Sequence, residues 1–193
     1  ISSATAFCSS INVDTTESEI RGYIDRLTAL MDRIDTAHML VVVSALIELC
    51  NAELENIARK EAEQKFMLIE EINKVIVEIE NGISTGNDIL NEALTFVNES
   101  VNVDVVGKIN DTSSSLLSKK LATDIVLDDD LDSIKTALNN LTTVRDEVVD
   151  LNKVAEQMRD DCKNNYNAYY LTVAIDALNN AIANANAAVQ NAM

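Results

Sequence analysis

The stretch LTTVRDEVVDLNKVAEQMRDDC, residues 141–162, repeats an apolar residue at alternating intervals of three and four positions. This spacing places the apolar side chains on one narrow face of an α-helix, as in the seam of a coiled coil. The acidic run LDDDLD at 127–132 precedes it and suits the positive end of a helix dipole. The sequence predicts a long amphipathic helix with a seam of Leu141, Val144, Val148, Leu151, Ala155, Met158, Cys162, Tyr166, Tyr169 and Val173.

Similar spacing recurs along the chain, and we expect helices over 16–34, 38–83, 87–98, 129–165 and 168–191. Thr16 and Glu19 have the spacing of a capping box at the start of the first helix. The apolar spacing lapses at RKEAEQK (59–65), which leaves open whether 38–83 is one helix or two. STGND at 84–88 is interpreted as a break between helices.

Proline and glycine are scarce, which bears on the fold class. The chain of 193 residues has no proline and four glycines, whereas sheet proteins need such residues at frequent turns. We therefore predict an all-α protein: an elongated, mostly antiparallel bundle of four to six amphipathic helices with coiled-coil-like seams. Residues 1–193 are expected to form a single domain, with an extended arm at 1–15, a long connection at 98–115 and a weak helix at 116–123.

The net charge of −17 limits the partners that the chain can take. It argues against nucleic acid, because binding phosphates requires a basic surface. It also argues against electrostatic docking on anionic membranes. No stretch approaches the ~18 consecutive apolar residues of a membrane-spanning helix, so no transmembrane segment is expected.

Three N-glycosylation sequons indicate a secreted protein, and they begin at Asn98, Asn110 and Asn140. The three cysteines fit an extracellular chain with one disulfide and one remaining thiol. We favour a bridge between Cys50 and Cys162, because both lie on apolar stripes that antiparallel helices can bring together. A bridge from Cys8 and three buried thiols in a reduced protein remain as alternatives.

No catalytic or metal-binding pattern is evident, so we expect no enzyme activity, no cofactor and no metal. His38 is the single histidine and has no cysteine or carboxylate at metal-ligand spacing. A calcium-binding EF-hand loop beginning at Asp128 would need glycine at its sixth position, where Ser133 stands. The carboxylate pairs lack the histidines of a di-metal helical bundle.

Three of the four tyrosines lie close together, at Tyr166, Tyr169 and Tyr170. Their flat apolar faces and hydroxyl groups can orient a ligand in a pocket. With Met158, they are the candidate ligand-binding residues. The alternative interpretation is that they only pack inside the bundle.

The last twenty residues, AIDALNNAIANANAAVQNAM at 174–193, carry one charge, Asp176, although the chain is acidic. On a helix, the face opposite the apolar residues of this segment is rich in asparagine and alanine. Such a face allows close approach to a neighbouring acidic helix without repulsion. We interpret the segment as a central helix flanked on both sides by the bundle. Its apolar stripe consists of Ile175, Leu178, Ile182, Ala185, Val189 and Ala192.

With stripes at this spacing, no proline and no tryptophan, the chain resembles secreted amphipathic bundles such as insect apolipophorin III. The first functional hypothesis is a secreted, non-enzymatic protein that binds an apolar, lipid-like molecule or coats an apolar surface. The second is a structural protein that self-associates into a homo-oligomer through coiled-coil seams. A third is ice or mineral binding through the asparagine- and alanine-rich face of the C-terminal helix.

Overall fold

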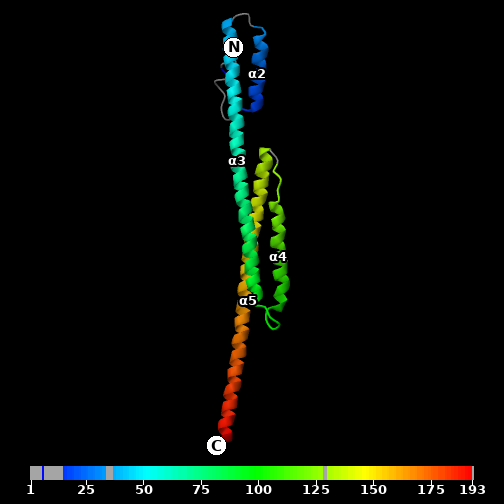
Figure 1. Cartoon of the computed structure of the whole chain (residues 1–193), viewed down its shortest axis with the longest axis vertical. Helices are drawn as coiled ribbons and strands as arrows, with labels where there is room; N and C mark the ends of the chain where they lie inside the picture. Colours follow the sequence, from blue (N-terminus) through cyan, green and yellow to red (C-terminus); the bar gives the residue numbers. More distant parts are fainter. Residues whose placement is uncertain (1–5, 7–14, 34–36, 128–129, 193) are drawn as a thin grey trace. The chain divides into compact units, whose positions relative to one another are not determined.

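The computed structural model describes residues 6, 15–33, 37–127 and 130–192, drawn as coloured ribbon in Figure 1. These residues contain four α-helices, two short 3-10 helices and no strand, which confirms the predicted all-α class. The α-helices are α2 (Glu17–Met31), α3 (Ala37–Thr95), α4 (Val106–Lys120) and α5 (Leu131–Ala192). The 3-10 helices are η1 (Val103–Val105) and η2 (Leu121–Thr123).

The chain divides into two compact units, residues 1–67 (unit 1) and 68–193 (unit 2). The helix α3 contributes its first part to unit 1 and its last part to unit 2. Each unit has its own cluster of buried apolar residues.

In unit 1, α2 starts at the predicted capping box. The hydroxyl oxygen of Thr16 accepts a hydrogen bond from the backbone N–H of Glu19 at 3.3 Å, and the Glu19 carboxylate accepts one from the Thr16 N–H at 2.9 Å. These bonds satisfy backbone donors that the first helical turn leaves unpaired. Leu27 of α2 and Val43 of α3 are buried in one cluster and pack the two helices together.

The predicted break at 84–88 is wrong, because α3 passes through it without interruption. Gly82, which precedes this stretch, and Gly86, which lies within it, serve close packing against α5 rather than a turn. A Cβ atom at Gly82 would lie 2.7 Å from Cγ1 of Val148, and one at Gly86 would overlap the side-chain oxygen of Asn152. The segments predicted as 38–83 and 87–98 are therefore parts of one helix.

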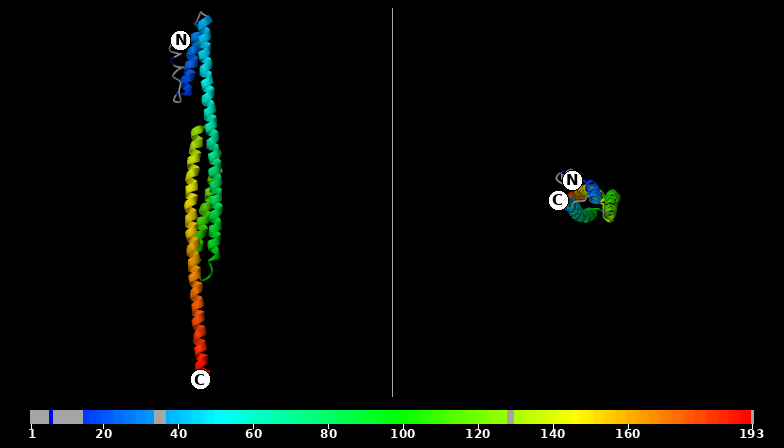
Figure 2. Two further views of the ribbon diagram at one scale, coloured as in Figure 1. Left: turned by 90° about the vertical axis from the view of Figure 1, so that its left-hand side faces the viewer. Right: turned by 90° about the horizontal axis from the view of Figure 1, so that it is seen from above.

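In unit 2, α3 and α5 run parallel, whereas the sequence led us to expect mostly antiparallel neighbours (Figure 2). Glu78 of α3 pairs with Arg145 of α5 at 3.5 Å, and Glu92 pairs with Arg159 at 3.7 Å. Both residues of the second pair lie fourteen positions later in their helices, so the register is constant. The helix α4 runs antiparallel to α5. It leads the chain from the end of α3 back to the start of α5 (Figure 1).

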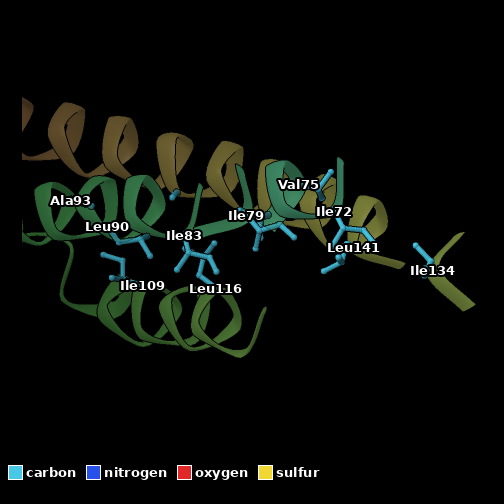
Figure 3. Packing of buried hydrophobic residues seen from close by; sticks show 12 residues of the cluster. Ile72, Val75, Ile79, Ile83, Leu90, Ala93, Ile109, Leu116, Ile134 and Leu141 are labelled. Atoms are coloured by element: carbon cyan, nitrogen blue, oxygen red, sulfur yellow. The ribbon is translucent and has the colours of Figure 1, made fainter. Parts of the chain in front are cut away.

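The core of unit 2 lies between α3, α4 and α5, and its apolar side chains point toward one another (Figure 3). Four positions of the predicted α5 seam are buried: Leu141, Val148, Ala155 and Cys162. Three others are partly buried and pack against the cluster: Val144, Leu151 and Met158. The apolar spacing of 141–162 thus identified the buried face of α5.

The predicted connection at 98–115 contains most of α4 instead. Its β-branched residues suggested an extended chain, but Ile109, Thr112 and Leu116 recur at helical spacing and are buried on one face of α4. Residues 96–105, which include a tight turn at 98–101 and η1, separate α3 from α4. The predicted weak helix at 116–123 is the end of α4 followed by η2.

The helices predicted at 129–165 and 168–191 are one continuous helix, α5. Its burial ends at Tyr166, and every residue from 167 to 190 is exposed. Within unit 2, neither α4 nor the last part of α3 lies beside this part of α5 (Figures 1 and 2). Within unit 2, the interpretation of the C-terminal segment as a central helix flanked on both sides is therefore wrong.

Candidate functional site

The exposed part of α5, residues 167–190, is named the tail segment here. Its apolar side chains recur at alternating intervals of four and three residues, although no described residue covers them. Exposed fractions are 63% for Leu171, 48% for Ile175, 60% for Leu178, 50% for Ile182 and 59% for Val189. With Ala185, these residues form what we call the tail seam.

The tail seam has the heptad spacing of a coiled coil. Counted in heptads, the β-branched residues Ile175, Ile182 and Val189 occupy the a positions, and Leu171 and Leu178 occupy d positions. This distribution of β-branched residues and leucine between the two positions is typical of coiled-coil seams, and Ala185 occupies the third d position. The amino-acid choice within the seam is therefore more specific than a general apolar stripe.

The tail seam does not continue the buried face of α5. Seven-residue steps from Cys162 lead to Tyr169 and Asp176, whereas the tail seam passes through Ile175. One residue corresponds to a rotation of about 100° around an α-helix. The tail seam thus faces a different direction from the α5 surface that packs on α3 and α4.

The tail segment is almost uncharged. Asp176 is its one charged residue, in a chain with 32 acidic and 15 basic residues. The positions that flank the tail seam carry threonine and asparagine on one side, at Thr172, Asn179 and Asn186. On the other side they carry only alanine, at Ala174, Ala181 and Ala188.

A cluster of aromatic rings marks the place where α5 leaves the core. The ring of Tyr166 meets that of Phe96 edge-on, with centroids 5.8 Å apart, and lies 4.6 Å from the ring of Tyr170. Tyr169 meets Tyr170 edge-on at 5.2 Å. The three predicted tyrosines thus come together, whereas Met158 packs in the core, where its sulfur accepts a hydrogen bond from Thr112.

Two asparagines of the turn after α3 bind α5 at this place. The side-chain amide of Asn102 donates to the backbone carbonyl of Cys162 at 2.8 Å, and its oxygen accepts from Asn165 at 3.1 Å. Asn98 donates to the hydroxyl of Tyr170 at 3.1 Å. Asn102 has a φ of 61°, a left-handed conformation that asparagine tolerates better than most residues.

The sequence alone does not identify these asparagines as contacts between the turn and α5. Asn102 stands in a β-branched run, VNVDVV at 101–106, and an asparagine there is a signal for a left-handed turn residue. That signal locates the turn, but the partner on α5 lies sixty residues away and is set by the parallel register.

Two shallow grooves adjoin the aromatic cluster, with volumes of about 490 and 350 Å³. The larger is lined mostly by polar groups, among them Asn102, Lys108 and Asp161. The smaller lies against Tyr169 and Tyr170. The pKa of Tyr170 is raised, chiefly by the neighbouring Tyr166 and secondly by burial.

The predicted glycosylation sites have different surroundings. Asn98 is partly buried, and its side-chain nitrogen, the atom to which a glycan would be attached, bonds the hydroxyl of Tyr170. Asn110 in α4 and Asn140 in α5 are exposed.

The predicted bridge between Cys50 and Cys162 is not formed in the structure, where Cys162 is a free thiol. The prediction required antiparallel long helices, but α3 and α5 run parallel in unit 2. Cys50 belongs to unit 1 and Cys162 to unit 2, and both are buried. Cys8 lies outside the described residues.

The described ranges contain no group of three or more His, Cys, Asp or Glu residues that could hold a metal ion.

The helix α3 is long and apolar enough, by length and composition, to cross a membrane: an 18-residue window has a mean hydropathy of 1.5, and 11% of it is buried. No family model, no curated protein and no solved structure matches the chain.

Proposed function

We propose that the protein is a structural, self-associating protein whose chains join through the tail segment in a coiled coil. The observation that carries this proposal is the tail seam itself, an ordered heptad pattern that no described residue covers. Exposed contiguous apolar surface of this kind is typical of interaction sites.

A helix without tertiary contacts gains little stability from its own sequence. In water, isolated helices depend mainly on residue propensity, and even alanine-rich ones are marginal at modest length. The tail segment mixes alanine with asparagine, which is a weak helix former. Covering the tail seam by a partner helix is therefore the physical condition under which a tail helix is stable.

A second copy of the chain fits this surface electrostatically. Two copies that each carry a net charge of −17 repel each other over most of their surfaces. The tail segment, with Asp176 as its one charge, is a region where two copies can approach without that repulsion. A strongly basic partner, in contrast, would gain nothing from an uncharged surface.

The second candidate function is the secreted, non-enzymatic binding of lipid-like molecules or of an apolar surface. It is supported by the apolar part of α3, where Val41 and Leu49 are 67% and 51% exposed. In this role α3 would cover an apolar surface, and the tail seam would be a further contact with it. Liposomes of neutral phospholipid that change the circular dichroism of the protein would favour this function.

A matched pair of substitutions on one helix tests self-association. Ile182→Asp places a charge in the tail seam, and Val173→Asp places one on the opposite face, where Val173 is 44% exposed. Light scattering of the wild-type chain should give a dimer that the Ile182→Asp variant loses and the Val173→Asp variant keeps. A wild-type chain that stays monomeric at all concentrations would rule the proposal out.

A further inference from the structure

Resting on the proposed self-association, we propose that two tail segments pair antiparallel, as a two-fold symmetric dimer centred on residue 180. The tail helix runs from residue 167, where burial of α5 ends, to Ala192, where α5 ends. The midpoint of this stretch lies between residues 179 and 180, so an axis at residue 180 pairs Ala168 with Ala192. Antiparallel pairing about residue 180 uses nearly the whole length of the tail helix.

The order of side chains in the tail seam matches this centre. Antiparallel pairing about residue 180 brings each a position opposite a d position of the second copy. The resulting layers pair Leu171 with Val189, Ile175 with Ala185, and Leu178 with Ile182. Two of these layers pair a larger residue with a smaller one and the third pairs two residues of equal size, so Ala185 always meets a large side chain.

Parallel, in-register pairing distributes the same side chains less evenly. Each residue would then meet its own copy, so that Ile175 and Ile182 form wide layers and Ala185 forms a narrow one. Protein interiors are closely packed, and layers of unequal width leave gaps or bend the helices. The size order of the seam therefore favours the antiparallel arrangement.

Charge and helix dipoles also favour the antiparallel arrangement. A parallel pair would place the two acidic ends of the cores, with Asp160 and Asp161, at the same level. In the antiparallel pair the points where the two helices leave their cores lie about 36 Å apart, at 1.5 Å per residue. That separation is several times the Debye length of about 8 Å in physiological salt. Antiparallel helix dipoles also attract.

The residues beside the seam make the arrangement testable. Around an antiparallel two-fold axis, residues at e face e positions, so Asn179 meets Asn179 of the second copy. In a parallel pair, e positions face g positions, and Asn179 would meet an alanine. A charge at position 179 therefore meets its own copy only in the antiparallel dimer.

The first experiment uses Asn179→Asp and Asn179→Lys in the full chain. In the antiparallel dimer each variant alone should dimerise roughly tenfold more weakly, because like charges face each other. An equimolar mixture should restore the dimer as a mixed species, measured by sedimentation with one variant fluorescently labelled. A mixture that dimerises no better than either variant would overturn the antiparallel assignment.

A photo-crosslink supplies a second, independent measurement. A benzophenone amino acid at Ala188 should react with the second copy near Thr172 in the antiparallel dimer, and near its own position in a parallel one. Cleavage before Asp176 separates these two regions into different peptides. The same probe at Ala187, on the face away from the seam, is the control and should give little crosslink.

The outcomes separate this inference from the function on which it rests. A monomeric wild-type chain would overturn both self-association and the antiparallel arrangement. The same holds if the chain is monomeric and its tail segment binds neutral phospholipid vesicles instead. A dimer whose Ala188 probe reacts within 176–193 would keep self-association and overturn the antiparallel arrangement. A trimer or tetramer would also overturn it.

Discussion

Asn152 of α5 donates a hydrogen bond from its side-chain amide to the backbone carbonyl of Gly82 in α3, at 3.0 Å. The side-chain oxygen of the same residue is buried and has no hydrogen-bond partner within the described chain. Gly86 leaves the space that this oxygen occupies. The two glycines and Asn152 thus form a point of close approach between the parallel helices α3 and α5.

Gly86→Ala should destabilise unit 2. The added Cβ would overlap the Asn152 oxygen and lie 2.6 Å from Cδ1 of Leu116. Overpacking of this kind typically costs about 1–3 kcal/mol, which exceeds the gain of up to about 1 kcal/mol from replacing a helical glycine. The urea midpoint should fall for Gly86→Ala and should not fall for Gly107→Ala, where a Cβ meets nothing within 4 Å.

The clash at Gly86 should depend on Asn152. Removing the oxygen with Asn152→Ala should make Gly86→Ala less harmful, because only Leu116 then has to move. A double-mutant cycle on urea unfolding should give a coupling free energy of about 0.5 kcal/mol or more. Strictly additive effects would show that Gly86 does not serve this contact.

Asn102 should stabilise the turn after α3 in two separable ways. Asn102→Gly keeps the left-handed backbone but loses the bonds to Cys162 and Phe96, at a cost of about 1–3 kcal/mol. Asn102→Ala loses these hydrogen bonds and also the tolerance of a left-handed backbone. It should therefore be less stable than Asn102→Gly by about 1 kcal/mol. Equal unfolding free energies for the two variants would contradict a backbone contribution at this position.

The raised pKa of Tyr170 predicts a loss of stability at alkaline pH. Its pKa is higher in the folded chain than the ordinary value of about 10, so the unfolded chain releases this proton first as the pH rises. The stabilising contribution is complete below the ordinary pKa and disappears as the pH rises through the folded pKa. Urea midpoints measured across this range should fall less for Tyr170→Phe than for the wild type.

Cys162 should react slowly with iodoacetamide in the native protein. Its side chain is 1% exposed, and burial, with the charge of Asp161, raises the pKa of its thiol. Only the thiolate is nucleophilic, so both effects lower the rate. Peptide mapping should show Cys162 alkylated quickly only after unfolding in urea. Its recovery in a crosslinked peptide with Cys50 before reduction would instead support the bridge predicted from the sequence.

The sequence was sufficient where the structure depends on neighbours in the chain. The capping box at Thr16 and the burial of Leu141, Val148 and Ala155 follow from local spacing, and both are present. The scarcity of glycine and proline predicted the all-α class for the same reason.

The sequence was insufficient where the outcome depends on a distant segment. Gly82 and Gly86 suggest a turn when they are considered alone, and their role in close packing becomes evident only with Val148 and Asn152 beside them. The parallel direction of α3 and α5 depends on α4, whose helical character was hidden by β-branched residues. The stripe of the tail segment was recognised, but spacing alone does not reveal that no described residue covers it.

Sedimentation equilibrium of the full chain over a wide range of concentrations tests self-association most directly. The polypeptide has a mass of 21.1 kDa. We predict that the apparent mass rises from that of one chain to that of two as the concentration increases, and that Ile182→Asp abolishes the rise while Val173→Asp leaves it unchanged. A mass of one chain at every concentration, or equal effects of the two substitutions, would contradict a dimer formed through the tail seam.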